Sequence, residues 1–308
     1  MAKLRFIVSL ITKDNDYQVE QAASAQAAAQ KLGVDLQILY ADNDAITQST
    51  QLLKTIQADA SERPQAILFE PVGGTAFPQV AQAAVSAKIA WGALNREADY
   101  LPQLRKTAQV PVFTVTSDHQ EIGRIQGRQF TALLPKGGTV LYIQGPTETS
   151  AARDRTAGMQ LTLAHNIQVI SLRGRWTEES AQRAVESWLR LNTSNKIRID
   201  VVSAQNDLMA IGARKAFEGV SNLIDRERWL RTPCTGVDGL SKTGLAWVRT
   251  GLLTATVLVP TNAGQAVSMM AEALQTGKDV PERTFTVPES FPSIEKLATA
   301  CEKVAPTL

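Results

Sequence analysis

Apolar residues along the chain fall into two alternating patterns, short mostly continuous runs and repeats at helical spacing. Residues 4–11 form such a run, which is typical of a strand buried on both faces of a parallel sheet. Residues 19–32 then carry apolar side chains at spacings of three and four, and Gly33 follows as a typical helix C-cap. The chain therefore opens with a strand and a helix that packs on the sheet.

The same cycle continues along the chain in two series. In the first series, strands are predicted at 36–40, 66–69, 89–94 and 110–116, with helices at 48–57 and 77–87. In the second, the predicted elements are helix 122–134, strand 139–144, helix 151–165, strand 167–173, helix 178–191, strand 201–204, helix 210–216 and strand 235–237. Alternating strands and helices imply parallel strands with right-handed crossovers. The predicted fold class is α/β, with two doubly wound, Rossmann-like parallel-sheet lobes.

The end of the chain is expected to recross between the lobes. A strand at 255–259, a helix at 264–276 and a strand at 284–287 complete the pattern. We predict an N-terminal lobe of residues 1–117 plus 260–286, and a C-terminal lobe of residues 118–259 plus 287–308. The length of 308 residues fits two cores, because single cores stop growing near about 250 to 300 residues. A multi-segment hinge favours closure about a cleft, with the ligand chemistry at the carboxyl ends of the strands.

Composition and charge narrow the class of partner. Hydrophobic residues make up 44% and charged residues 20%, a globular composition. The 32 basic and 30 acidic residues are spread along the chain and give a formal charge of +2, which argues against a nucleic-acid partner. Since no run approaches the ~18 to 20 apolar residues of a membrane span, we expect no membrane insertion.

The cysteines and histidines offer no metal site. Cys234 and Cys301, together with His119 and His165, lack the C-x-x-C spacing of a zinc site. Two unrelated buried thiols are favoured over a disulfide, which stays open as the alternative for an oxidising compartment. No metal and no cofactor are expected.

Polar and aromatic side chains follow the predicted strands. Carboxylates, amides and guanidinium groups around aromatic faces suit a sugar, because hydroxyls donate and accept hydrogen bonds while C–H surfaces stack on rings. The candidates are Asn15, Tyr17, Glu70, Asn95, Arg96, Arg153, Arg155, Trp176, Asn206, Asp207 and Asp238. Taken singly, Arg155 is more often a helix-surface or structural cation, whereas Trp176 is equally a packing residue and Asn206 with Asp207 equally a helix cap.

Catalytic motifs are missing from the sequence. It contains no G-x-S-x-G elbow, no Walker loop and no G-x-G-x-x-G after the first strand. His119 and His165 lie in helix-associated segments without a nucleophile pattern, and we expect surface or capping roles for them. We therefore predict that the chain is not an enzyme, although fold alone excludes no activity.

Four motifs, in order, carry a resemblance to a known family: SDHQEIG (117–123), AARDRTAG (151–158), AQNDLMAIGA (204–213) and GVDG (236–239). On these motifs the chain resembles the periplasmic sugar-binding proteins of the ribose-binding type, over nearly its whole length. That family shares its fold, the type I periplasmic binding protein fold, with the ligand-binding core of lactose-repressor-like regulators.

The resemblance implies roles for single residues. Arg155, Asn206 and Asp238 match family positions that hydrogen-bond sugar hydroxyls. The remaining matches are Asn95 and Arg96 to the acidic–Arg pair, Tyr17 and Trp176 to the aromatic partners, and Asn15 to the asparagine of the first loop.

The chain departs from the family at three positions. Asn95 replaces the usual aspartate, Glu70 stands where ribose binders often have an amide, and Val259 falls about where relatives place an amide. The rearranged polarity argues against ribose itself. A deoxy sugar, a methylated sugar and a polyol all fit an apolar patch.

The implied function is that of a solute-binding protein of an ABC importer, which captures a monosaccharide or polyol by lobe closure and delivers it to a permease. The alternative is the ligand-sensing core of a sugar-responsive signalling or transcriptional regulator, with a membrane sensor as the partner. We expect a monomer. The apolar run at 6–11 is shorter than the ~7 to 15 residues of a signal-peptide core, so we interpret it as a strand of a mature chain. The resemblance implies a periplasmic location, and the cytoplasm stays open as the alternative.

Overall fold

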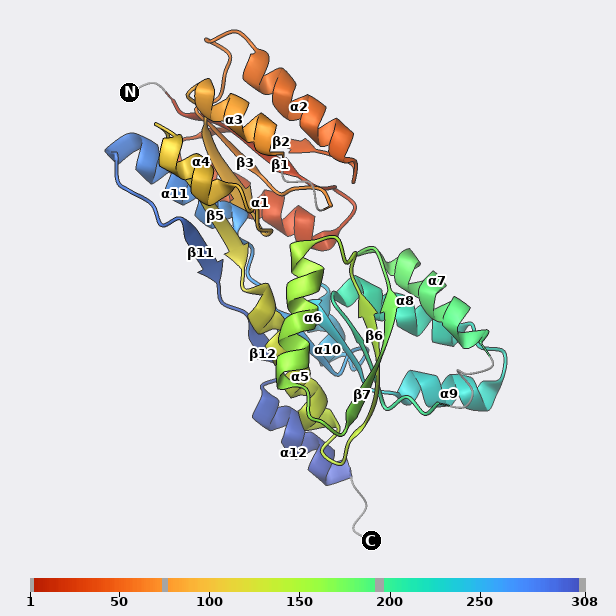
Figure 1. Cartoon of the computed structure of the whole chain (residues 1–308). Helices are drawn as coiled ribbons and strands as arrows, with labels where there is room; N and C mark the ends of the chain where they lie inside the picture. The colour runs from red at the N-terminus through yellow and green to blue at the C-terminus, as the bar shows by residue number, and fades with distance from the viewer. Residues whose placement is uncertain (1–2, 74–76, 192–196, 305–308) are drawn as a thin grey trace. The chain divides into compact units, whose positions relative to one another are not determined.

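The computed structural model describes residues 3–73, 77–191 and 197–304, and side chains through residue 299 (Figure 1). The chain divides into two compact units. Unit 1 consists of Met1–Ser117 and Pro260–Thr286, and unit 2 of Asp118–Val259 and Val287–Leu308. The chain therefore passes three times from one unit to the other, after Ser117, Val259 and Thr286.

Unit 1 is built on a six-stranded sheet in the order β11-β5-β4-β3-β1-β2, in which all neighbouring strands are parallel. Its strands are β1 (Arg5–Leu10), β2 (Asp35–Tyr40), β3 (Ala66–Phe69), β4 (Ala90–Leu94), β5 (Val112–Ser117) and β11 (Arg283–Thr286). Its helices are α1 (Asp16–Leu32), α2 (Ala45–Gln57), α3 (Pro78–Ser86), α4 (Leu101–Thr107) and α11 (Ala263–Thr276).

The four inner strands of unit 1 are buried on both faces, to which successive side chains of a strand point in turn. Phe6 and Val8 of β1 join a core cluster with residues of α1 and α11. Ile7, which lies between them, joins a separate cluster with residues of α2, α3 and α4. Helices thus cover both faces, which explains why the strand sequences are continuous apolar runs.

Unit 2 repeats this plan with the sheet order β12-β10-β9-β8-β6-β7. Its strands are β6 (Gly138–Gln144), β7 (Ile167–Arg173), β8 (Val201–Ala204), β9 (Cys234–Asp238), β10 (Ala255–Leu258) and the antiparallel edge strand β12 (Glu289–Phe291). Its helices are α5 (His119–Leu133), α6 (Ser150–Thr162), α7 (Glu178–Leu189), α8 (Asp207–Glu218), α9 (Leu223–Arg231), α10 (Gly244–Arg249) and α12 (Ile294–Val304).

The sheet of unit 2 is also covered on both faces. Val140 and Tyr142 of β6 pack with residues of α5, α6 and α12, whereas Leu141 and Ile143 pack with residues of α7, α8 and α9. The predicted fold class of two doubly wound α/β lobes is confirmed, with β12 as an antiparallel addition at one edge.

The first helix begins and ends as its caps dictate, and three alanines of its predicted face are buried, but the ends of that face are not. Asn15 caps the N-terminus, and Gly33 ends the helix in the left-handed region with φ of 68°. Val19 and Leu32, which the spacing assigned to the buried face, are 47% and 37% exposed. Gln18 and Gln21 are buried in their place because both are held by hydrogen bonds to neighbouring polar groups.

Helices α5 and α6 approach so closely that only glycine fits at the contact. A Cβ atom added to Gly158 would lie 1.9 Å from the backbone oxygen of Gln120. One added to Gly123 would lie 2.0 Å from the backbone oxygen of Arg155. The contact therefore fixes the segment of α6 that carries Arg155.

Gly158→Ala is expected to destabilise the protein by about 1 to 3 kcal/mol or more, because the backbone at the contact cannot yield without separating the helices. Urea unfolding measures the loss. Gly219→Ala is the matched control, since a Cβ there meets nothing closer than 3.4 Å and φ is −77°. Equal stability of the two variants would contradict the close-contact argument.

No helix in the described part of the chain is long and apolar enough to span a membrane. Among the described side chains, no group of three or more His, Cys, Asp or Glu residues is placed to hold a metal ion. Cys234 is a buried free thiol whose pKa burial raises to about 12, whereas the side chain of Cys301 lies outside the described residues.

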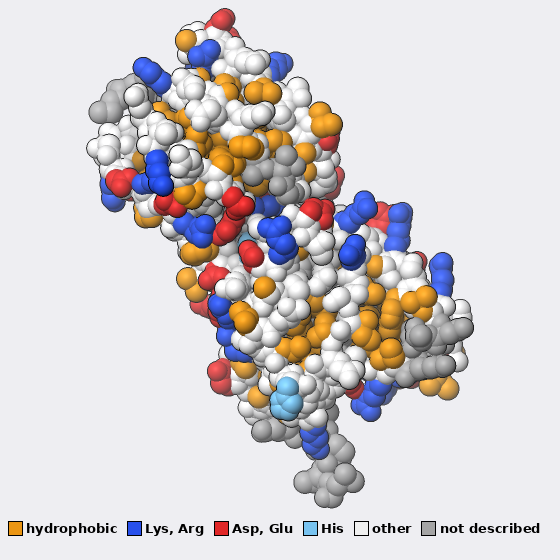
Figure 2. Space-filling model, in the orientation of Figure 1, with side chains coloured by type: hydrophobic (Ala, Val, Ile, Leu, Met, Phe, Trp, Pro, Cys, Tyr) orange, Lys and Arg blue, Asp and Glu red, His pale blue; other side chains and the backbone are white. Residues whose placement is uncertain are grey.

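Surface charge is mixed on the face shown in Figure 2, where basic and acidic side chains are interspersed over both units. Such a distribution creates no extended field of one sign over that face.

Candidate functional site

In unit 1, the candidate residues lie at the carboxyl edge of the sheet, around the point where the strand order reverses. The chain runs from β1 to β2 on one side and then to β3 on the other, so loops leave in opposite directions after β1 and β3. Doubly wound sheets bind ligands at such switch points. Asn15 follows β1, Glu70 follows β3, and Asn95 and Arg96 follow β4.

Glu70 is the centre of a polar cluster in this lobe. It is 1% exposed, and its carboxylate accepts hydrogen bonds from Nε2 of Gln18 at 2.8 Å and Nδ2 of Asn95 at 3.0 Å. The Nε atom of Arg96 lies 3.7 Å from the same carboxylate. A buried carboxylate with these partners keeps its charge compensated, and it ties together the loops after β3 and β4 and the start of α1.

Asn95 and Arg96 are held by the backbone as well as by Glu70. Asn95 has φ of 57°, a left-handed conformation that asparagine tolerates better than most residues. Arg96 donates through Nη1 to the backbone oxygens of Pro71 at 2.6 Å and Gly73 at 3.2 Å. The guanidinium group is therefore fixed in place.

Asn15 and Tyr17 hold the start of α1. Oδ1 of Asn15 accepts from the backbone N–H of Tyr17 at 2.9 Å, as an N-cap side chain does. Tyr17 is 6% exposed, and its hydroxyl donates to the backbone oxygen of Pro260 at 3.3 Å. Both residues thus have a structural role, which the sequence did not reveal.

In unit 2, Arg155 is a buried cation at the equivalent edge. It is 5% exposed, so the alternative of a helix-surface cation is wrong. Its Nη1 donates to the backbone oxygen of Gln205, and its Nε donates to Nδ1 of His119 at 3.4 Å. His119 is 3% exposed, so the expected surface role is wrong for it too, and the side chain that caps α5 is that of Asp118.

Trp176 lies beside Arg155, with the guanidinium carbon 5.4 Å from the ring centroid. This is a cation–π distance. The indole reaches its position only because residue 145 is a glycine, since a Cβ there would lie 2.3 Å from the ring. Asn206 completes the link, because its Nδ2 donates to the backbone oxygen of Trp176 at 3.0 Å.

Asn206 also caps α8, as the sequence allowed. Its Oδ1 accepts from the backbone N–H of Met209 at 2.9 Å. The preceding residue, Gln205, is fully buried and was missed by sequence reasoning. Nε2 of Gln205 lies 3.0 Å from each of three acceptors, the Tyr142 hydroxyl, the Ala152 backbone oxygen and the Thr156 hydroxyl, which share its two N–H groups. Its only signal in the sequence is its place inside the 204–213 motif.

Asp238 ends β9 with φ of 112°, and it lies beside the buried Asp207. Burial raises the pKa of Asp207 well above its ordinary value, and the Asp238 carboxylate raises it further. Val259, the apolar departure from the family, is 3% exposed, and its backbone N–H donates to the backbone oxygen of Asp238 at 3.0 Å. Arg153, the remaining candidate, is exposed on α6.

Each lobe therefore brings some of its predicted residues into contact. In unit 1 these are Glu70, Asn95 and Arg96, and in unit 2 they are Arg155, Trp176 and Asn206. Their role in ligand binding stays a prediction.

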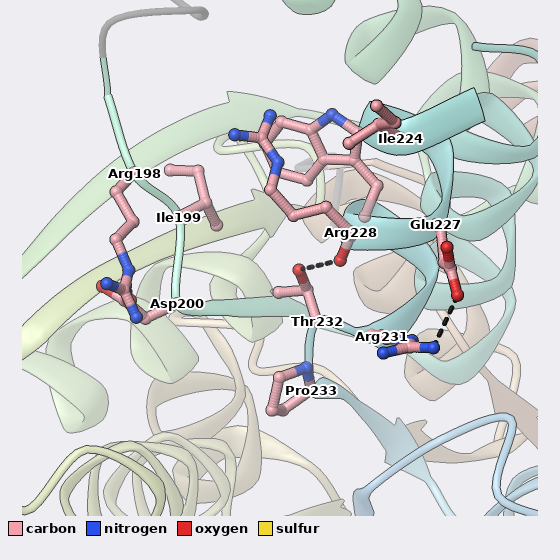
Figure 3. Close-up of a pocket in the computed structure, with 10 residues that line it drawn as sticks. Arg198, Ile199, Asp200, Ile224, Glu227, Arg228, Arg231, Thr232 and Pro233 are labelled. Carbon is pink, nitrogen blue, oxygen red and sulfur yellow. Dashed lines mark hydrogen bonds and ion pairs between the residues drawn. The ribbon is translucent and has the colours of Figure 1, made fainter. Parts of the chain in front are cut away.

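A pocket of about 670 Å³ lies elsewhere on unit 2 (Figure 3). It is lined by residues before β8 and β9 and by α9, so it opens at the amino edge of the sheet. Four of the charged groups that line it are paired with one another, Arg198 with Asp200 and Arg231 with Glu227, and the guanidinium group of Arg228 lies over the Trp229 ring. This position and pairing do not match a ligand site of a doubly wound lobe.

The fold and the two polar clusters define a class, the two-lobed α/β binding proteins with a cluster at the carboxyl edge of each sheet. Residues 6–279 match the family model described as a periplasmic binding protein domain. The chain belongs to this family, which consists of binding proteins and not enzymes.

Individual proteins agree with this assignment. The putative rhizopine-binding protein of Rhizobium meliloti is 31% identical over 201 residues, which cover 63% of this chain and 60% of that protein. The ribose import binding protein of Salmonella typhimurium is 27% identical over 91% of this chain and 88% of its own length. The periplasmic binding protein component of the arabinose ABC transporter from Shewanella sp. ANA-3 superposes with a TM-score of 0.79 at 23% identity, covering 98% of this chain and 95% of that chain. This last likeness confirms the fold.

Proposed function

We propose that this chain is the solute-binding protein of an ABC importer, which captures a monosaccharide or related polyol by closure of its lobes and delivers it to the permease. The proposal rests on one combined observation. This chain belongs to the periplasmic binding protein family, and it has a polar cluster at the carboxyl edge of each of its two sheets. A ligand held by both clusters favours the closed form, because it binds that form more tightly than the open one.

The chemistry of the clusters supports a polyhydroxylated ligand. Arg96 and Arg155 supply fixed guanidinium donors, Asp238 supplies an acceptor, and Trp176 supplies an aromatic face. Hydroxyl groups use donors and acceptors together, and charge-assisted hydrogen bonds of about 1.5 to 3 kcal/mol each are enough for micromolar affinity. Asn15, Tyr17, Glu70, Asn95 and Asn206 complete the proposed site, with several of them acting through their neighbours.

The proposed partner and compartment follow from the family. The related proteins named above include an import binding protein and a transporter component, which supports a permease as the partner. A family of periplasmic binding proteins supports a periplasmic location.

A thermal-shift screen with pentoses, hexoses, deoxy sugars, methylated sugars and polyols tests the function. A ligand at about 100 times its Kd stabilises the native state by about 2.7 kcal/mol, and we expect a rise in Tm of several degrees for one stereochemistry. The mirror-image sugar is the matched control and should give no shift.

Absence of any shift, in protein that mass spectrometry shows to carry no copurified small molecule, would contradict the proposal. Recovery of the bound sugar unaltered after incubation separates binding from turnover.

A further inference from the structure

Asp207 is the first residue of α8 and is 2% exposed. Its two carboxyl oxygens accept one hydrogen bond each. Oδ2 accepts from the backbone N–H of Gly239 at 2.7 Å, and Oδ1 accepts from the hydroxyl of Thr256 at 2.7 Å. Both bonds cross from α8 to the neighbouring strands, since Gly239 follows β9 and Thr256 lies in β10.

The Asp207 carboxyl group fits where it lies only because two neighbouring residues, Gly236 and Gly244, have no side chain. A Cβ added to Gly236 would lie 2.1 Å from Oδ1 of Asp207, and one added to Gly244 would lie 2.0 Å from Oδ2. Any other residue at either position would collide with the carboxyl group. The two glycines and the two hydrogen bonds therefore enclose Asp207.

The bond to Gly239 fixes an unusual turn. Asp238 has φ of 112° and Gly239 has φ of 61°, so two successive residues lie outside the conformations that side chains normally favour. An aspartate keeps such a conformation only where the surroundings impose it. The Asp207 carboxyl group is the side chain that holds the second residue of this turn.

We propose that Asp207 is a positioning residue that holds the Asp238–Gly239 turn and thereby sets the direction of the Asp238 carboxylate. This inference rests on the proposed function, in which Asp238 meets the ligand. Asp207 acts through Asp238 and not on the ligand, because both of its oxygens are already engaged by Gly239 and Thr256.

Asparagine is a good replacement at this position. Its side-chain oxygen can accept from Gly239, and its amide can donate to the hydroxyl oxygen of Thr256. The charged groups facing Asp207 are Asp238, which raises its pKa, and Arg155, which lowers it. Asparagine also has the size and planar shape of the carboxyl group, so it fills the space between Gly236 and Gly244 in the same way.

The test compares Asp207→Ala with Asp207→Asn in the full chain, using the sugar identified in the thermal-shift screen. We expect the alanine variant to bind at least tenfold more weakly and the asparagine variant to stay within about threefold of wild type. Amide hydrogen exchange at Gly239 should be faster in the alanine variant and unchanged in the asparagine variant. Thr235→Val is the matched control, because it removes a buried hydrogen bond to Ser203 in the same sheet without touching the turn.

Failures of the two ideas look different. A wild-type protein that binds no sugar or polyol contradicts the proposed function. A wild-type protein that binds, with an alanine variant that binds equally and protects Gly239 equally, overturns the positioning role. If the alanine variant does not fold, hydrogen exchange of the wild-type protein still tests the positioning role of Asp207. A Gly239 amide that exchanges as fast as an unprotected amide overturns that role.

Discussion

Replacing Arg155 with alanine is expected to weaken sugar binding by on the order of 100-fold or more. The guanidinium group is buried, is anchored to the backbone oxygen of Gln205 and to His119, and lies over the Trp176 ring. The Arg155 side chain therefore loses little further conformational entropy when a ligand binds. Two charge-assisted bonds of about 1.5 to 3 kcal/mol each correspond to a loss of that size, at about 1.4 kcal/mol per factor of ten. Isothermal titration with the sugar from the screen measures it.

Arg153→Ala is the control for the Arg155 variant. Arg153 lies on the same helix two residues away, is exposed, and donates only a long bond of 3.5 Å to the Glu148 backbone oxygen. We expect its Kd to equal that of wild type. An Arg155→Ala protein that keeps wild-type affinity, with the fold intact by circular dichroism, would remove Arg155 from the site.

Three strands were predicted with the bounds that the structure shows. The strands at 66–69, 167–173 and 201–204 have the observed bounds of β3, β7 and β8. Strands β3 and β8 are buried along their whole length, so the apolar run and the strand coincide. The boundaries of the helices shift by a few residues because capping residues, such as Asn206 before α8, begin the helix earlier than the apolar repeat does.

The sequence did not predict the elements that lack a repeating apolar pattern or are too short to show one. In α9, Leu223 and Ile224 are 65% and 81% exposed, while the buried anchor is the single residue Trp229, stacked on Phe217. Such a helix has no repeating apolar face to detect. The strand β12 has three residues and the helices α4 and α10 have seven and six, which are too short for periodicity to resolve. Helix α12 was also missed.

The sequence predicted where the candidate site residues lie better than it predicted which contacts their side chains make. Loops after parallel strands meet at one edge of a sheet, so the order of elements places Glu70 near Asn95, as observed. Gln18 and Gln205 were missed because glutamine counts as a polar position in the pattern, and their burial depends on partners far away in the sequence. Asn15 and Asn206 act as helix caps, a role that a strand-end position does not distinguish from ligand binding.

Unit 1 is expected to be stable only when one of positions 70 and 95 carries a carboxylate and the other an amide, as Glu70 and Asn95 now do. Single and double exchanges at these two positions test this. Asn95→Asp alone places a second carboxylate about 3 Å from that of Glu70, in a buried cluster. Two like charges at about 4 Å repel by about 4 kcal/mol at an effective dielectric of about 20. Since Arg96 offsets part of this repulsion, we expect a loss of about 2 to 4 kcal/mol in the free energy of unfolding at pH 7.

The pH dependence of that loss has a defined sign. Repulsion raises the pKa of one carboxyl group in the folded Asn95→Asp protein above its unfolded value near ~4. The folded state then holds a proton that the unfolded state has released, so the stability relative to wild type falls as pH rises from about 4 and stays low at pH 7. Urea unfolding of both proteins at several pH values measures the difference. A difference that grows toward acid pH would contradict this mechanism.

The double variant Glu70→Gln with Asn95→Asp should recover most of the stability. The glutamine amide can donate to the aspartate, which reverses the present hydrogen bond and keeps one carboxylate in the cluster with Arg96. Glu70→Gln alone removes the carboxylate beside the Arg96 guanidinium and is expected to be destabilising on its own. A favourable coupling of about 2 kcal/mol or more in the double-mutant cycle is the expected result, and simple additivity of the two single variants would show that positions 70 and 95 act independently. The reversed arrangement places the acid after β4 and the amide after β3, which is the pattern that the resemblance assigns to ribose binders. The double-mutant cycle therefore also tests whether the departures from that pattern at positions 70 and 95 depend on each other.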